Sequence, residues 1–276
     1  MSPISSHFAY FSFLQNTVAH TLRSSILILM YTHTISQYLT LIKEQKALID
    51  SLRPFDQDQL ASLQQRFRIN FTQQSNALEG NSLTLSEVKV LVEDGITVWG
   101  KTVAEINETL NHASLLDILW TERSDAFVTT QRLLQRHSTL MTGVIESDKI
   151  GIWRPIQVFI SWSTDVLPAP DTISWLMDDY CAMWRDGPTS LEDIARIHYD
   201  LVKIHPYIDG NGRIARLVMN MWLIALWYFP IIIPTVVRNE YIASVNDDHT
   251  FDDFYHFLLR QIHENHKDYI RLFQNK

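Results

Sequence analysis

The stretch HPYIDGNGRIAR, residues 205–216, brings several side chains that could do chemistry close together in the chain. A neutral imidazole such as that of His205 can accept a proton near neutral pH. Gly210 and Gly212 let the backbone adopt a positive φ and approach a ligand closely. If a helix begins at about Asn211, its free amides form an anion site with the positive end of the helix dipole behind them, and phosphate is the usual ligand there.

Two arginines and one acid add to this site. Arg213 and Arg216 are three positions apart and share a helix face, and guanidinium groups bind phosphate oxygens in a bidentate way. Asp209 would repel a phosphate unless a cation such as Mg²⁺ lay between them. Each feature alone is common in an ordinary turn and helix start. Their combination predicts a phosphate-handling site with a base, a metal ligand and two cationic side chains.

The elements that must position this site are predicted to be helices. The chain has 276 residues, of which 46% are hydrophobic, 20% are charged and only 8 are Gly, which is typical of a helical globular protein. Capping-box spacing, in which Ser or Thr is followed three positions later by Glu or Asp, occurs at Thr84, Thr102, Ser190 and Thr250. We expect helices over about 31–50, 55–73, 85–93, 103–121, 130–142, 172–185, 191–204, 211–228, 240–247 and 251–273.

Two features near the site refine this fold. Pro206 ends the helix that precedes the site, and the apolar run LVMNMWLIALWYF predicts that the helix after it is central and buried. The segment IGIWRPIQVFISWS, residues 150–163, has β-branched and aromatic residues around Gly151 and Pro155, which predicts a short hairpin or an extended flap. The predicted fold class is therefore mainly α, a helical bundle with a short β-hairpin flap.

Charge and composition argue against several classes of protein. A formal net charge of −8 argues against a nucleic-acid partner, which needs a basic face. No stretch reaches the ~18 apolar residues of a membrane span, so no membrane partner is expected. The single cysteine, Cys181, cannot form a disulfide within the chain. Residues 1–43 lack Asp and Glu but contain one arginine, a poor match to a transit peptide, so we expect a cytoplasmic protein.

The stretch 205–216 resembles the signature of the Fic-domain family, His-Pro-Phe-x-Asp/Glu-Gly-Asn-Gly-Arg-x-x-Arg. Every position agrees except Tyr207, where the family has Phe. The resemblance implies a Fic-type helical bundle and an enzyme that transfers AMP from ATP to a hydroxyl of a target protein. An aromatic side chain at this place packs into the core, so the tyrosine needs either extra room or a partner for its hydroxyl.

The resemblance also implies a role for each residue of the signature. His205 would deprotonate the attacking Ser, Thr or Tyr hydroxyl, and Asp209 would hold Mg²⁺. Arg216 would bind the γ-phosphate. The remaining phosphate-binding residues implied by the resemblance are Gly210, Asn211, Gly212 and Arg213.

A second stretch, SNALEGN, begins at Ser75 and resembles the family's inhibitory motif, Ser/Thr-x-x-x-Glu-Gly/Asn. The resemblance implies that Glu79 reaches into the active site and pairs with Arg216, which can then no longer bind the γ-phosphate. Ser75 and Glu79 are one helical turn apart, which suits one short helix over about 72–82 with Gly80 at its end. Because the motif precedes the signature, the chain resembles the subgroup with an N-terminal inhibitory helix in the same chain.

The resemblance covers two further segments. In the family a hairpin before the signature pairs with the backbone of the target, and IGIWRPIQVFI occupies that position. The segment RNEY resembles the family's nucleobase-pocket segment, so Asn239 is expected to bond to the adenine and Tyr241 to stack on it. These matches predict a Fic domain over 56–276. An N-terminal helical segment with a disordered start is expected over 1–55.

Four functions are consistent with this sequence. The first is an autoinhibited AMP transferase, and the glycines at 210 and 212 favour it, because related kinases and phosphocholine transferases replace one or both. The second is another nucleotide or phosphate transfer. The third is AMP removal, with Glu79 positioning a water, and the fourth is a binding module without catalysis, against which the retained His205 argues. The expected partners are ATP, a protein hydroxyl and the chain itself, and a homodimer through the helix at 31–50 stays open.

Overall fold

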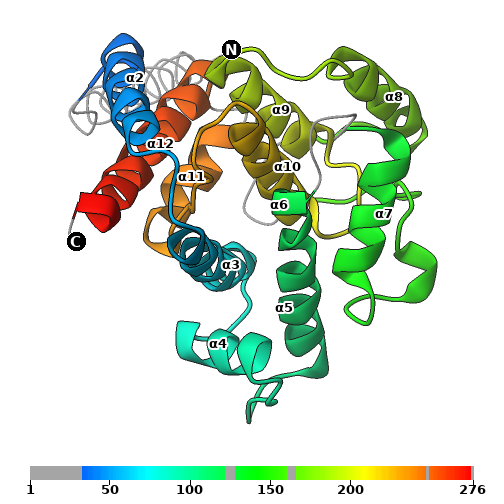
Figure 1. Cartoon of the computed structure of the whole chain (residues 1–276). Coiled ribbons are helices and arrows are strands. Elements are labelled where there is room, and N and C mark those ends of the chain that lie inside the picture. Colours follow the sequence, from blue (N-terminus) through cyan, green and yellow to red (C-terminus); the bar gives the residue numbers. More distant parts are fainter. Residues whose placement is uncertain (1–32, 122–127, 161–165, 247–248, 275–276) are drawn as a thin grey trace, which may run out of the picture.

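The structure is a computed structural model that describes residues 33–121, 128–160, 166–246 and 249–274. These residues form a bundle of α-helices and contain no β-strand (Figure 1), which confirms the mainly α fold class. The helices are α2 (Ile35–Ser51), α3 (Gln57–Leu78), α4 (Leu85–Glu93), α5 (Val103–Leu116), α6 (Ile118–Thr121), α7 (Thr130–Met141), α8 (Ile173–Met183), α9 (Leu191–Ile204), α10 (Asn211–Ala225), α11 (Arg238–Val245) and α12 (Phe251–Gln274). Short 3₁₀ turns cover Ser147–Lys149, Pro170–Thr172 and Thr235–Val237.

The helix starts lie where the capping signals predicted them. Complete capping boxes precede α4, α5 and α9, at Thr84, Thr102 and Ser190. Before α12, the Thr250 amide donates to Asp253 Oδ2 at 2.8 Å, and the Asp253 amide donates to Thr250 Oγ1 at 3.4 Å. These reciprocal bonds satisfy amides that have no partner within the helix, so each start is encoded locally.

The helix that follows the signature loop, α10, is the central one, as its apolar sequence predicted. Every residue from Ile214 to Leu223 is buried, and α10 packs along α9 in the middle of the bundle (Figure 1). The helix ends at Ala225, earlier than the predicted 228. Trp227 adopts a left-handed conformation with φ 65°, and the Tyr228 amide returns to the Leu223 carbonyl at 2.8 Å. This bonding pattern closes the last helical turn without a glycine.

The predicted hairpin flap, residues 150–163, has no strand in its described part, 150–160. Its base is held by single contacts instead of a ladder of hydrogen bonds. The Arg154 amide donates to the Pro206 carbonyl at 2.8 Å, and the next residue, Pro155, has no amide hydrogen to donate. Residues 161–163, which complete the predicted flap, lie outside the described residues.

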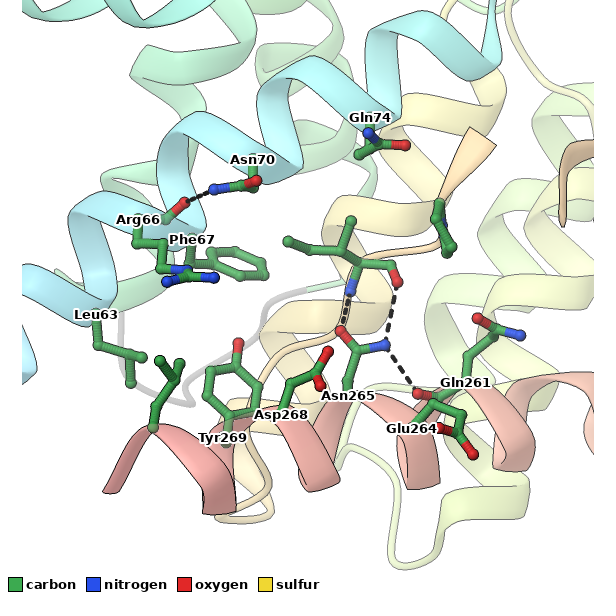
Figure 2. A pocket seen from close by; sticks show the side chains of 13 residues that line it. Leu63, Arg66, Phe67, Asn70, Gln74, Gln261, Glu264, Asn265, Asp268 and Tyr269 are labelled. Atoms are coloured by element: carbon green, nitrogen blue, oxygen red, sulfur yellow. Dashed lines mark hydrogen bonds between the residues drawn. The ribbon is translucent and has the colours of Figure 1, made fainter. Parts of the chain in front are cut away.

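The two ends of the described chain pack together, since α2 lies along α12 (Figure 1). The predicted disordered start lies outside the described residues, and the domain boundary at residue 55 stays a prediction. Between α3 and α12 is a cavity of about 330 Å³ (Figure 2). Beside this cavity, the Asn265 side chain holds the backbone of Ile232: its Oδ1 accepts from the Ile232 N–H at 2.9 Å, and its Nδ2 donates to the Ile232 carbonyl at 3.1 Å. These two bonds fix the segment that leads to α11. Among the described helices, none combines the length and the hydrophobicity that a membrane-spanning segment requires.

Candidate active site

The signature loop begins where α9 ends, at His205. This residue adopts a left-handed conformation with φ 51°, and its amide still donates to the Leu201 carbonyl at 3.1 Å. Its own carbonyl accepts from Arg154 Nε at 2.8 Å. Arg154 is 1% exposed and donates also to the carbonyls of Ile156 and Pro168. A buried guanidinium thus ties the base of the flap to the backbone of the histidine.

Tyr207 and Asn211 fix the shape of the loop. The hydroxyl of Tyr207 donates to the Leu133 carbonyl at 3.0 Å, and its ring stacks on His137 with centroids 4.0 Å apart, so the tyrosine has the hydroxyl partner that it needs. The side chain of Asn211 accepts from the Tyr207 amide and donates to the Tyr207 carbonyl, both at 2.9 Å. The Asn211 side chain therefore closes the loop, and of the groups of Asn211 only the backbone amide is left for a ligand.

The two glycines of the loop are required for different reasons. Gly210 has φ 84°, which side chains other than that of glycine adopt at a cost, and a Cβ there would approach Met141 Sδ to 3.1 Å. Gly212 lies in the first turn of α10, where a Cβ would collide with the carboxylate of Glu79. Together they leave the N-terminus of α10 open to an anion.

Asp209 is the candidate Mg²⁺ ligand, and its side chain is half exposed. Its Oδ1 accepts from its neighbour's amide, at Gly210, and from Arg213 Nη2 at 2.6 Å. Oδ2 has no hydrogen bond among the described residues. The described residues also contain no cluster of three side chains that could bind a metal, so the ligands of a cation here would be the Asp209 carboxylate and the oxygens of a phosphate. That ligand set is the one Mg²⁺ takes in nucleotide sites, so the residues fit the ion.

Arg216 has its guanidinium buried among acceptors from two other helices. Nε donates to Ser75 Oγ at 3.0 Å, and Nη2 donates to the Ser75 carbonyl at 2.9 Å and to Glu79 Oε1 at 2.6 Å. Nη1 lies 3.4 Å from the hydroxyl of Tyr241, which in turn lies 3.0 Å from His198 Nε2. The arginine is 1% exposed, so nearly all of its donors face protein atoms.

Glu79 stands at the end of α3, and Gly80 follows with φ 103°, which ends the helix as predicted. Burial raises the pKa of the Glu79 carboxyl, but the guanidinium groups of Arg216 and Arg213 outweigh burial and lower the net pKa. Burial lowers the pKa of Arg216, yet Glu79 raises the net value. Each partner therefore holds the other in its charged form. Of the expected helix over 72–82, residues 72–78 are the last part of the longer helix α3, and residues 79–82 follow its end.

His205 has the protonation state that a base requires. Burial lowers its pKa to about 4, although the Val202 carbonyl acts in the opposite direction. Nδ1 lies 3.3 Å from that carbonyl, an acceptor that calls for the proton on Nδ1. Nε2 is then the unprotonated nitrogen and is available at neutral pH as the proton acceptor for a hydroxyl.

These side chains surround one cavity of about 450 Å³. Of the predicted site residues, its lining includes Glu79, His205, Asp209, Gly212, Arg216 and Tyr241. Ser75, Asn211 and Arg213 lie behind this lining and hold it in place. Asn239 is exposed on the first turn of α11 and is not part of the lining, and the buried Tyr241 already uses its hydroxyl for Arg216 and His198. Their proposed contacts with adenine stay predictions.

Several residues at this site carry no local signal in the sequence. Arg238 and Lys203 line the cavity, and Arg238 Nε donates to the Leu78 carbonyl at 2.7 Å. Arg154 and Glu108 contact the signature from distant segments. Arg238 and Arg154 could have been suspected, since they belong to RNEY and to the predicted flap, two segments already singled out in the sequence.

Comparisons with known proteins agree with this geometry. The model of the Fic/DOC family matches residues 127–223. The protein adenylyltransferase Fic of Nematostella vectensis is 34% identical over 195 residues, which are 67% of this chain and 45% of that protein. The protein adenylyltransferase fic-1 of Caenorhabditis briggsae is 32% identical over 179 residues, which are 62% of this chain and 34% of that protein. The chain thus spans less than half the length of these relatives.

The fold also has relatives among solved structures. A Fic domain containing signaling protein from Bacteroides thetaiotaomicron superposes with a TM-score of 0.75 at 24% identity, covering 86% of this chain and 98% of that chain. The similarity extends across most of the bundle and therefore identifies the fold.

Proposed function

Because this chain carries a Fic domain and is homologous to Fic protein adenylyltransferases, we propose that it transfers AMP from ATP to a hydroxyl of a target protein. The observation that carries the proposal is the cavity in which His205, Asp209 and Arg216 meet at the N-terminus of α10. A base, a carboxylate for a cation and an arginine for phosphate are what an attack on a nucleotide phosphate requires.

The transfer follows from the positions of these groups. Arg216 and the amides at the start of α10 bind and orient the triphosphate. His205 Nε2 accepts the proton of the target hydroxyl while the hydroxyl oxygen forms a bond to the α-phosphorus. The bond from that phosphorus to the oxygen bridging to the β-phosphate breaks, and pyrophosphate leaves. Mg²⁺, when bound at Asp209, supplies neutralisation of the phosphate charge.

Regulation by Glu79 is the second part of the proposal. Its carboxylate and the γ-phosphate of ATP compete for one cation, that of Arg216, which supports an inhibited resting state. Self-modification is the expected sign of release. The predicted homodimer and cytoplasmic location stay predictions.

AMP removal is the alternative use of the same residues. Glu79 is about a third exposed and lines the same cavity as His205, so its carboxylate could orient a water for hydrolysis of an AMP–protein bond. The Glu79→Gly variant separates the two activities, because loss of the Glu79 carboxylate is expected to increase AMP transfer and to abolish AMP removal.

The test uses the Glu79→Gly protein with a cell lysate and ATP labelled at either the α- or the γ-phosphate. Label that reaches protein only from the α position supports AMP transfer. Label from the γ position means phosphoryl transfer, and label from neither, with nucleotide binding intact, contradicts the proposal. A His205→Asn protein in the same background is the control, since asparagine tolerates the left-handed backbone but cannot act as the base.

A further inference from the structure

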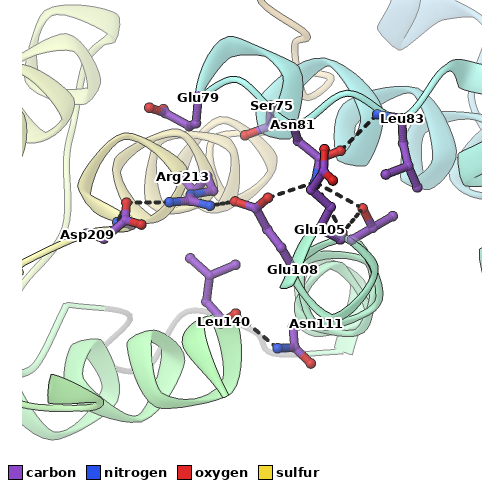
Figure 3. A network of polar contacts seen from close by, with 12 residues as sticks. Ser75, Glu79, Asn81, Leu83, Glu105, Glu108, Asn111, Leu140, Asp209 and Arg213 are labelled. Carbon is purple, nitrogen blue, oxygen red and sulfur yellow. Dashed lines mark hydrogen bonds and ion pairs between the residues drawn. The ribbon is translucent and has the colours of Figure 1, made fainter. Parts of the chain in front are cut away.

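Arg213 is buried between two carboxylates (Figure 3). One belongs to Asp209, which lies in the loop just before α10. Its Oδ1 is 2.6 Å from Nη2 of Arg213. The other belongs to Glu108 of α5, which forms an ion pair with Nη1. Glu108 is 7% exposed, and a carboxylate buried to that degree requires charged or hydrogen-bonding partners.

The second oxygen of Glu108 faces the turn that follows Glu79. Asn81 Nδ2 donates to Glu108 Oε2 at 2.7 Å and to the Glu105 carbonyl at 3.1 Å, while Asn81 Oδ1 accepts from the Leu83 amide at 3.0 Å (Figure 3). Glu108 therefore joins the turn after α3 to the arginine of the signature. Removing it would leave both sides without their shared partner.

The two carboxylates that pair with Arg213 would respond differently to a bound nucleotide. Asp209 is the candidate Mg²⁺ ligand, and a cation there would draw charge away from the arginine. Glu108 is buried and is not among the residues that line the cavity, so a ligand in the cavity does not compete directly for its carboxylate. The Nε–H of Arg213 is also buried and has no acceptor among the described residues, which leaves one donor of this guanidinium unused.

We propose that Glu108 is a positioning residue that holds Arg213 at the phosphate end of the site and keeps it from pairing fully with Asp209. The proposal rests on the proposed function for the identity of the ligand. When Glu108 is neutralised, Asp209 is the one of these two carboxylates that still carries a charge, so Arg213 pairs more strongly with Asp209. Mg²⁺ must then compete with the guanidinium of Arg213 for the Asp209 carboxylate. Glu108 thereby acts through Arg213 on the affinity of the site for the cation.

The experiment compares Glu108→Gln with Glu105→Gln, both in the Glu79→Gly protein. Glu105 lies on the same helix and also holds the turn after α3, through Ser82, but does not contact Arg213. We measure the binding of ATP by calorimetry over a range of Mg²⁺ concentrations, and the rate of AMP transfer over the same range. For Glu108→Gln we expect half-saturation at several-fold higher Mg²⁺ and a rate between about tenfold and a hundredfold lower, as for misplaced catalytic groups.

A role confined to stability predicts a different pattern. It would lower the melting temperature of both glutamine variants while leaving the Mg²⁺ concentration at half-saturation unchanged, and that result overturns the proposal. Equal shifts in the two variants overturn it as well. If Glu108→Gln does not fold, Glu108→Asp retains the charge and is expected to show a smaller shift in the same direction; a wild-type Mg²⁺ response in that variant counts against the proposal.

A double substitution identifies Arg213 as the intermediary. Adding Glu108→Gln to Arg213→Ala should cause no further loss, because the residue through which Glu108 acts is already gone. Additive losses contradict the proposal. If the Glu79→Gly protein transfers no AMP, the proposed function fails, and the calorimetric Mg²⁺ response still decides the role of Glu108.

Discussion

Glu79 and Arg216 lie 137 positions apart in the sequence and are joined by an ion pair of 2.6 Å. The glutamate comes from the end of α3 and the arginine from the second turn of the central helix α10. Arg216 is nearly fully buried, and Glu79 is its carboxylate partner among the described residues. In the proposed mechanism, the state of this pair determines whether the arginine is available to a phosphate.

Loss of Glu79 should destabilise the ligand-free protein. Glu79→Gly leaves the Arg216 cation buried without its partner, which costs 3–5 kcal/mol for fully buried pairs, and we expect about 1–3 kcal/mol because Glu79 is partly exposed. ATP with Mg²⁺ should restore part of this loss, since ligand binding stabilises the folded state. Thermal unfolding measures both effects, with Glu146→Gly, which breaks an exposed pair with Lys149, as the control. Equal melting temperatures for the two variants would refute the expectation.

Replacement of His205 should abolish transfer and spare nucleotide binding. The imidazole acts on the target hydroxyl, and loss of a general base commonly lowers a rate by ~10²–10⁴. His205→Asn suits the left-handed backbone, and Arg154 contacts only the carbonyl of residue 205, so the loop should keep its shape. The measurements are the AMP transfer rate and the dissociation constant of ATP. A large loss of ATP affinity in the asparagine variant would mean that the histidine is structural.

Replacement of Asp209 should remove the response to Mg²⁺. Asp209→Asn keeps an oxygen that can accept from the Gly210 amide but lacks the negative charge that attracts the cation. We expect transfer to fall sharply and to become insensitive to added Mg²⁺. The check is a titration of the transfer rate with MgCl₂. Wild-type activity with an unchanged Mg²⁺ response would assign the metal site elsewhere.

The parts of the fold that follow from local chemistry were predictable. Thr84, Thr102 and Ser190 each act on the residue three positions ahead, so their helices begin where the spacing predicted. The end of α10 was predicted three residues late because the left-handed Trp227 replaces the usual glycine signal. A capping glycine would have marked that end in the sequence.

The site was predictable to the same extent and for the same reason. The signature and Glu79 belong to compact motifs, whereas Arg154 reaches His205 across 51 positions and has no motif of its own. Glu108 is likewise one acid among many on an ordinary helix until the fold places Arg213 beside it. Sequence spacing identifies groups that act together within one or two helical turns, and packing alone brings in the rest.

Acid should destabilise this protein over a defined range of pH. Burial lowers the pKa of five histidines to about 3 or about 4, at His112, His137, His198, His205 and His266. The folded state holds them neutral, whereas the unfolded chain binds protons below its ordinary pKa near 6.5. Stability is thus fully present above pH 6.5 and is lost as the pH falls from 6.5 through the folded-state pKa values of about 4 and about 3, by about 2 kcal/mol per histidine at pH 5.

Urea unfolding at pH 7.5, 6 and 5 measures this loss. His266 is fully buried and neither ring nitrogen has a hydrogen-bond partner among the described residues, so His266→Leu should reduce the dependence of stability on pH. The slope against pH is the relevant quantity, because the substitution also changes packing. A free energy of unfolding that stays constant from pH 7.5 to 5 would contradict the neutral buried state of these histidines.

Gly212 and Glu79 should be energetically coupled. Gly212 has an ordinary helical backbone, and alanine at such a position is usually favoured over glycine by about 1 kcal/mol. Here the added methyl would collide with the Glu79 carboxylate and approach Arg216 Nη1 to 2.9 Å, so Gly212→Ala should destabilise the protein. In the Glu79→Gly background the first collision is gone, and the alanine should cost less or stabilise. The two substitutions should therefore deviate from additivity by about 0.5–3 kcal/mol, the range for residues in contact, as measured by chemical unfolding of the four proteins of the cycle. Strict additivity would mean that the carboxylate does not occupy the space beside Gly212 in solution, and the ion pair with Arg216 would lose its role as the resting state.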